Sequence, residues 1–100
     1  MLTHQDAIAA VERELAQLEP LPDGDSWVVY FRRTIERPFG WVFFYGSRLY
    51  EQTGELRYAV AGNAPFVVNR GTGAVVSTGT SRSVEQYITE YEAALAQQRA

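Results

Sequence analysis

Few side chains in this sequence could act as nucleophiles, general bases or metal ligands. His4 is the only histidine, and the 100 residues include no cysteine. A serine nucleophile needs a base within hydrogen-bonding distance and a third group that orients the base. His4 falls in the first turn of a predicted helix, where a solvated role is favoured over catalysis. Because one histidine without sulfur or clustered carboxylates is no metal-ligand set, we expect no catalytic residue, no metal site and no cofactor.

Three glutamates are the remaining candidates for general acid–base catalysis, namely Glu36, Glu51 and Glu55. Two carboxylates can share this work when they face one another in a cleft. Exposed positions on turns are the favoured interpretation, and a carboxylate-based enzyme stays open as an alternative. The strings Gly71-Thr72-Gly73 and Gly79-Thr80 match no nucleotide-binding fingerprint, so turns and a helix cap are favoured there.

Aromatic residues are concentrated between Phe39 and Tyr45, in a run that includes Trp41. Proteins that bind single-stranded nucleic acid stack bases on such rings beside a basic groove. The formal net charge of -3 and the pI near 5.0 argue against that partner. Core packing is therefore favoured, although Trp41 or Tyr45 facing outward would provide an anchor for a protein partner.

Two amphipathic helices are predicted at the ends of the chain. The first covers residues 4–18, with Thr3 as its cap and apolar residues at helical spacing: Ala7, Ile8, Val11, Leu15 and Leu18. The second starts at a capping box formed by Ser83 and Gln86 and runs to the C-terminus, with Val84, Tyr87, Ile88, Tyr91 and Leu95 repeating at helical spacing.

Two antiparallel hairpins are predicted between the helices. In the first, residues 27–36 place Trp27, Val29, Phe31 and Ile35 on one face, and residues 41–45 are apolar on both faces, as in a central strand covered on part of both sides. Residues 65–69 and 74–78 form the second, joined by a glycine-containing turn at residues 70–73. The segment between the hairpins, residues 46–63, is predicted to be irregular, with an extended piece only at residues 56–61. A functional loop is expected there.

This order of elements indicates an α+β fold, with an antiparallel sheet of about four strands and both terminal helices packed on it, most simply on one face. The composition, 46% hydrophobic and 21% charged, suits one soluble domain over residues 1–100. No apolar run approaches the roughly 20 residues that span a bilayer, and charges interrupt the first residues, where a secretory signal would be apolar. We therefore expect a cytoplasmic protein without a membrane partner.

An ordered set of motifs resembles the immunity protein 35 family over roughly residues 27–91. The motifs are the string from Pro38 to Tyr45, Thr53-Gly54, the string from Ala61 to Pro65, Gly73, Thr78-Gly79-Thr80 and the helix with Glu85, Tyr87 and Tyr91. The resemblance implies a small cytoplasmic bacterial protein, encoded beside a polymorphic toxin, that protects the producing cell by binding that toxin. Inhibition would then be stoichiometric, without turnover or cofactor.

The candidate partner-binding residues lie at the end of the central strand and in the segment after it: Trp41, Tyr45, Arg48, Tyr50 and Glu51. Inhibitors of nucleases often carry strongly acidic surfaces, whereas -3 over 100 residues is mild. A peptidase or another protein-modifying toxin is therefore favoured over a nuclease, and we expect a monomer or a weak homodimer. The alternative function is a small-molecule or peptide-binding module with an aromatic-lined pocket between sheet and helix.

Overall fold

Six short strands and three helices are present in the computed structural model, which describes residues 1–60 and 63–99. The strands form two antiparallel sheets, one of order β1-β4 and one of order β2-β3-β5-β6. The predicted α+β class is confirmed. The structure has six strands in two sheets, where about four strands in one sheet were expected. The reason is that both strands of the first predicted hairpin are interrupted, and each is therefore split into two shorter strands.

The N-terminal helix α1 spans His4–Leu15 and starts as predicted. The Thr3 hydroxyl accepts from the Asp6 amide, and the Asp6 carboxylate accepts from the Thr3 amide. These hydrogen bonds hold the pKa of Asp6 below its usual range. The helix ends three residues earlier than the sequence predicts, because the amides of Gln17 and Leu18 bond to carbonyls three residues back in a tighter turn.

The first hairpin consists of β1 (Trp27–Val29), β2 (Ile35–Arg37), β3 (Gly40–Phe43) and β4 (Tyr45–Ser47). Its register changes in the middle. Tyr30 bonds to Phe44, which continues the pairing of β1 with β4, whereas Ile35 lies opposite Val42. The four residues 31–34 therefore lie opposite one residue, 43, which leaves three extra residues on the first strand. These form a short 3₁₀ turn, η1 (Phe31–Arg33).

The sequence predicted that Trp27, Val29, Phe31 and Ile35 share one face of the sheet, and this prediction is wrong beyond Val29. Because side chains alternate along a strand, an odd number of extra residues moves later side chains to the opposite face. Trp27 and Val29 pack on the α1 side, but Ile35 packs on the other side. Phe31 belongs to neither core and is 56% exposed.

The second hairpin pairs β5 (Phe66–Asn69) with β6 (Val75–Ser77), close to the predicted ranges. The Asn69 side chain accepts hydrogen bonds from the amides of Gly71 and Thr72 and so shapes the connecting turn. β5 also pairs with β3, which places β3 in the interior of the sheet. The prediction that the two hairpins form a sheet together is confirmed.

The segment predicted to be irregular contains regular structure. Helix α2 spans Arg48–Thr53. Its N-cap is Ser47, whose hydroxyl accepts from the Tyr50 amide, and its C-cap is Gly54, which has a left-handed φ of 71°. Residues Leu56–Tyr58 form a second 3₁₀ turn, η2, and not the predicted extended piece. Ala61, the last residue of the predicted extended piece, and Gly62, in the string that resembles the family, lie outside the described residues.

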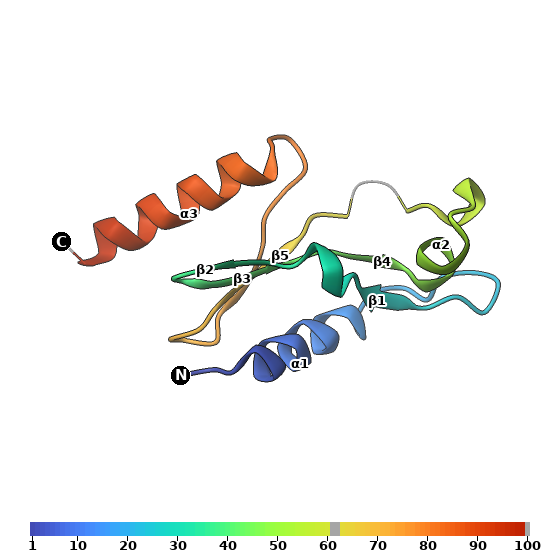
Figure 1. The fold of residues 1–100 in the computed structure, drawn as a ribbon, viewed down its shortest axis with the longest axis horizontal. Helices are drawn as coiled ribbons and strands as arrows, with labels where there is room; N and C mark the ends of the chain where they lie inside the picture. The colour runs from blue at the N-terminus through green and yellow to red at the C-terminus, as the bar shows by residue number, and fades with distance from the viewer. Residues whose placement is uncertain (61–62, 100) are drawn as a thin grey trace.

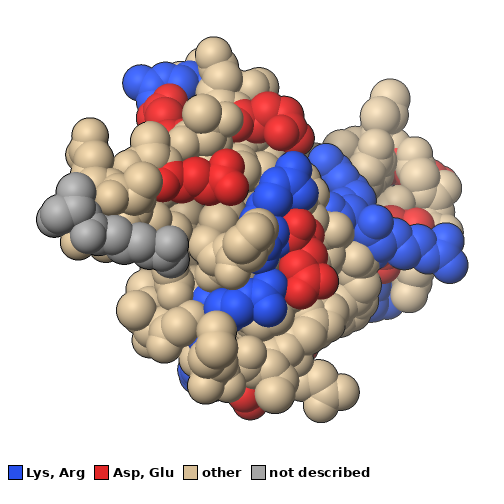
Figure 2. Space-filling view, turned by 60° about the vertical axis from the view of Figure 1, so that its left-hand side comes forward, with Lys and Arg blue, Asp and Glu red and all other residues tan. Residues whose placement is uncertain are grey.

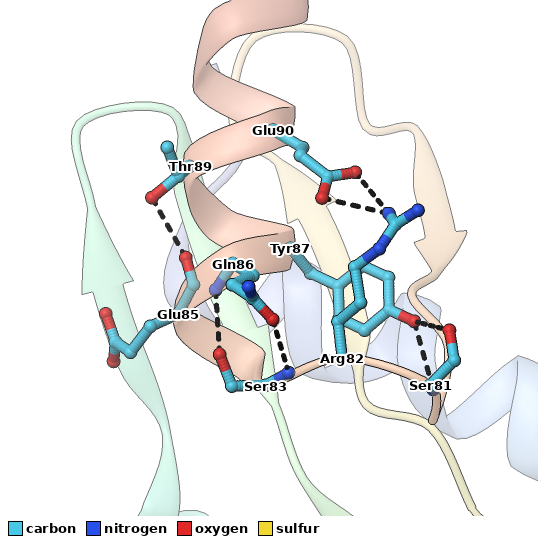
Figure 3. Close-up of polar contacts among 8 residues, drawn as sticks. All are labelled: Ser81, Arg82, Ser83, Glu85, Gln86, Tyr87, Thr89 and Glu90. Atoms are coloured by element: carbon cyan, nitrogen blue, oxygen red, sulfur yellow. Dashed lines mark hydrogen bonds and ion pairs between the residues drawn. The ribbon is translucent and has the colours of Figure 1, made fainter.

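The C-terminal helix α3 spans Val84–Arg99 and starts with the predicted capping box. The Ser83 amide donates to the Gln86 side chain, and the Ser83 hydroxyl accepts from the Gln86 amide (Figure 3). Arg82, just before the helix, reaches forward to both carboxylate oxygens of Glu90, at 2.7 and 2.9 Å. The start of α3 is therefore held by both backbone and side-chain contacts.

The two terminal helices cover opposite faces of the strands, as Figure 1 shows, so the expectation that both lie on one face is wrong. Trp41 and Phe43 pack against α1, together with Ala7 and Val11. Val42, between them in the strand, packs instead with Ile88 of α3. Because β3 is apolar on both faces, each face needs its own cover.

Candidate partner-binding surface

Trp41 and Tyr45, two of the five predicted partner-binding residues, are buried to 4% and 9% exposure. The Trp41 ring lies below the Arg70 guanidinium, whose central carbon is 4.7 Å from the ring centroid. Tyr45 stacks on Phe66 with centroids 5.1 Å apart, and burial raises the pKa of its hydroxyl. Both rings thus present little surface to a partner.

Arg48 connects the start of α2 to the preceding turn. Its guanidinium donates to the Ser26 hydroxyl at 3.1 Å, to the Gly24 carbonyl at 3.2 Å and to the Gln52 side chain at 3.3 Å. The side chain is only half-buried, so part of it stays accessible. Arg48 therefore fixes the position of α2 while remaining at the surface.

Asp25 is the acceptor that organises the same region. Its carboxylate accepts from the amides of Ser26 and Leu49, and from the hydroxyl of Ser47. Ser47 is 1% exposed and in turn accepts from the Tyr50 amide at 2.9 Å. Partial burial of the Asp25 carboxyl opposes its ionisation, but these hydrogen bonds outweigh that effect and lower its pKa. The network joins the start of α2 to the end of β4 and to the turn that holds Asp25.

Tyr50 and Glu51, on α2, also lie near the surface: Tyr50 is half-buried and Glu51 is exposed. Tyr50 borders a hollow of about 380 Å³ that we call the tyrosine hollow because Tyr30, Tyr45 and Tyr50 all line it, beside Arg33 and Phe44. The Tyr30 hydroxyl donates to the Ser47 carbonyl at 2.8 Å, and burial raises its pKa, with the nearby Glu51 carboxylate adding to the effect. The structure therefore brings Tyr45 and Tyr50 together at one hollow.

The three glutamates considered for acid–base chemistry do not form one group. Glu36 lies in β2 and bonds to Arg70 at 3.0 Å, at the opposite end of the molecule from α2, which carries Glu51 (Figure 1). Glu55 bonds to its neighbour Arg57 at 3.1 Å. The cleft with two facing carboxylates that the enzyme alternative requires is therefore not formed by Glu36 with either of the others.

His4 is exposed, as the sequence predicts for a helix surface. Its ring lies against Trp41 and Phe43, with centroids 5.7 and 5.8 Å away. Within residues 1–60 and 63–99, no three histidine, cysteine or acidic side chains come together as metal ligands. Over the same residues, no helix is long and apolar enough to cross a bilayer.

A second hollow, of about 470 Å³, lies between α1 and β1, and we call it the α1–β1 groove. Its lining is mainly apolar and includes Leu15, Leu18, Leu21, Trp27 and Phe31. Sequence reasoning missed Phe31 as a surface residue because it assigned the residue to a regular strand. The adjacent arginines at positions 32 and 33 are a signal for the interruption, since strict alternation would turn one of them inward.

Comparison with known proteins gives one family and one relative. The family described as Immunity protein 35 matches residues 5–93. An Escherichia coli K12 protein named uncharacterized protein YrhB is 34% identical over 94 residues, which cover 92% of this chain and 90% of that protein. No solved structure is significantly similar to the chain.

Proposed function

This chain belongs to the immunity protein 35 family, and from that premise we propose that it binds and neutralises a cognate bacterial polymorphic toxin. The complex is one-to-one and its action stoichiometric, without turnover or cofactor. The match over residues 5–93 is the observation that carries this proposal, because it includes nearly every element of the fold. The protein acts in the cytoplasm, as a monomer or a weak homodimer.

The surface around α2 is suited to such a complex because internal hydrogen bonds already hold its side chains in place. Side chains that are already ordered lose less entropy when a partner docks. The Asp25 network and the Arg48 contacts hold α2 against the turn at residues 24–26. Arg48, Tyr50 and Glu51 therefore make direct contacts in this proposal, while Trp41 and Tyr45 support the strands below them.

A peptidase or another protein-modifying toxin fits the charge distribution better than a nuclease. The net charge is only -3, and arginine and carboxylate side chains are interspersed on the face that Figure 2 shows. A mimic of nucleic acid would instead concentrate negative charge on one face. A cognate toxin that cleaved nucleic acid would contradict this preference.

Co-expression with the product of the adjacent gene tests the proposal. We expect the chain to restore growth and to be isolated with the toxin in a stable one-to-one complex. Tyr50→Ala should weaken the complex by about tenfold or more, whereas Glu92→Ala, an exposed change on α3, should leave it unchanged. A toxic neighbour that is neither bound nor neutralised would refute the assignment.

The α1–β1 groove supports the alternative of a small-molecule or peptide-binding module. Its volume of about 470 Å³ falls within the range of known ligand sites, about 300–1,000 Å³. Thermal unfolding in the presence of a library of apolar ligands and short peptides tests this alternative. A saturable rise in the melting temperature that is lost in Leu18→Asp would favour it over the immunity function.

A further inference from the structure

The η1 turn projects from a hairpin that would otherwise be continuous. It is visible in Figure 1 as the short teal turn between β1 and β2. Internal hydrogen bonds order it, since the Arg33 amide donates to the Tyr30 carbonyl at 2.9 Å and the Thr34 amide to the Phe31 carbonyl at 3.2 Å. Irregularities of this kind are frequent beside functional sites, where they redirect side chains. We call its three residues, Phe31, Arg32 and Arg33, the η1 ridge.

Phe31 is exposed without an internal reason. In the described part of the chain no other phenylalanine, tyrosine or tryptophan is as exposed as Phe31, at 56%. The other side chains of these three types are buried or half-buried. An exposed phenylalanine on an ordered turn is costly in water and resembles the apolar anchors that dominate binding energy at protein interfaces.

The arginines beside it have no carboxylate partner within the described residues. Ion pairs form instead at Arg37, Arg57, Arg70 and Arg82. Arg32 is exposed, and the Arg33 guanidinium lies over the Phe44 ring, 4.4 Å from its centroid. Two positive charges are thus available on a chain whose net charge is negative.

The ridge separates the two hollows described above. Phe31 lines the α1–β1 groove, and Arg33 lines the tyrosine hollow next to Tyr50. A partner docked over the ridge would therefore reach both the apolar groove and the surface near α2. This continuity connects the ridge to the residues on which the proposed function relies.

We propose that the η1 ridge is part of the toxin-binding surface and contacts an acidic segment of the toxin that carries an apolar side chain. The inference rests on the proposed function and adds the location and the chemistry of the contact. Phe31 and the groove take the apolar side chain, while Arg32 and Arg33 pair with carboxylates. A second copy of this chain is a poorer occupant, because a two-fold interface centred on the ridge would bring the same arginines together.

Binding of the purified cognate toxin to wild type and variants, followed by biolayer interferometry, tests the inference. Phe31→Ala should raise Kd by about tenfold or more. Arg32→Glu should slow association by about tenfold at low salt, and the effect should shrink as salt is added. Because Arg32 and Phe31 are exposed, thermal unfolding should show both variants folded.

Two matched controls separate the contact from general effects. Val76→Ala removes another exposed apolar side chain, 44% exposed on β6, and should change Kd by less than about twofold. The double change Gln97→Glu and Gln98→Glu shifts the net charge as much as Arg32→Glu does, at exposed positions near the end of α3. It should leave the association rate close to that of wild type.

The outcomes distinguish the two proposals. If wild type binds the toxin and the ridge variants bind equally well, the ridge is not part of the surface, while the proposed function stands. If wild type fails to bind, the proposed function is wrong and this inference falls with it. Light scattering that showed wild-type dimers, lost in Phe31→Ala, would identify a second copy as the occupant and overturn the assignment to the toxin.

Discussion

At the scale of single residues, backbone conformation decides how closely β3 and β5 approach. Gly40 has a φ of 149°, and a Cβ placed there would lie 1.9 Å from the Val68 carbonyl oxygen. No side chain fits unless the strands separate. The sequence places Gly40 just before the second strand of the first predicted hairpin, but the close contact with β5 comes from the tertiary arrangement.

Gly40→Ala should therefore lower the free energy of unfolding by about 3 kcal/mol or more, since steric overlap adds to the strain of the backbone. Gly54→Ala is the matched control, because Gly54 also has a positive φ, 71°, but no atom within 4 Å of its Cβ position. That change should cost only about 1–2 kcal/mol. Urea unfolding of both variants measures the difference, and equal costs would contradict the close-contact explanation.

Asp25 makes stability depend on pH. Its pKa in the folded protein lies below the ordinary value of 3.8, so its contribution is present above that pH and is lost as the pH falls through the folded pKa. Asp25→Asn should be less stable than wild type at pH 7, and the difference should shrink below about pH 4. Asp23→Asn, in the same turn, is the control. A difference that stayed constant from pH 6 to pH 2 would argue against this linkage.

At the scale of elements, η1 is an insertion that is not required for the strands of the first hairpin to pair. Tyr30 pairs with Phe44 and Ile35 with Val42, so removing residues 31–33 would leave Thr34 opposite Phe43 in a continuous register. The deletion variant should fold with the same side chains facing α1 and α3. It should also lose the toxin affinity assigned to the ridge.

Deletion of Arg32 and Arg33 alone is the control for this element. One extra residue would remain, which keeps the interruption but gives the turn too few residues to close as it does now. We expect a larger loss of stability in this variant than in the three-residue deletion, by circular dichroism during thermal unfolding. The opposite order would show that η1 stabilises the hairpin.

At the scale of the whole molecule, β3 couples two cores that lie on opposite faces. Trp27 and Trp41 belong to the α1 core, and Ile88, 3% exposed, belongs to the α3 core. Ile88→Ala should lower the free energy of unfolding by about 2–5 kcal/mol and should shift the unfolding midpoint reported by tryptophan fluorescence by the same amount as that reported by circular dichroism. An unchanged fluorescence midpoint would mean that α3 unfolds separately. Glu92→Ala, on the exposed side of α3, is the control.

Much of the candidate site lay beyond prediction from sequence. Arg48, Tyr50 and Glu51 were identified near the surface, but Trp41 and Tyr45, of the same residue types as interface anchors, pack inside. Phe31 was assigned to a core face and is exposed. Residue type predicts what a side chain can contact. Whether the side chain is buried depends on the strand register and on the element that packs against that face of the sheet. Helix α2 was also missed, since its six residues give too short a pattern.

By itself, the sequence determined the properties that depend on neighbours along the chain: the capped start of each terminal helix, the hairpin at residues 66–77, the α+β class and the family. The tertiary structure alone decided the opposite placement of α1 and α3 and the projection of η1. The physical reason is the distance along the chain between the residues that interact. Capping and turn formation involve residues within about four positions of one another, whereas the facing of a strand follows from a register set by partners far away in the sequence.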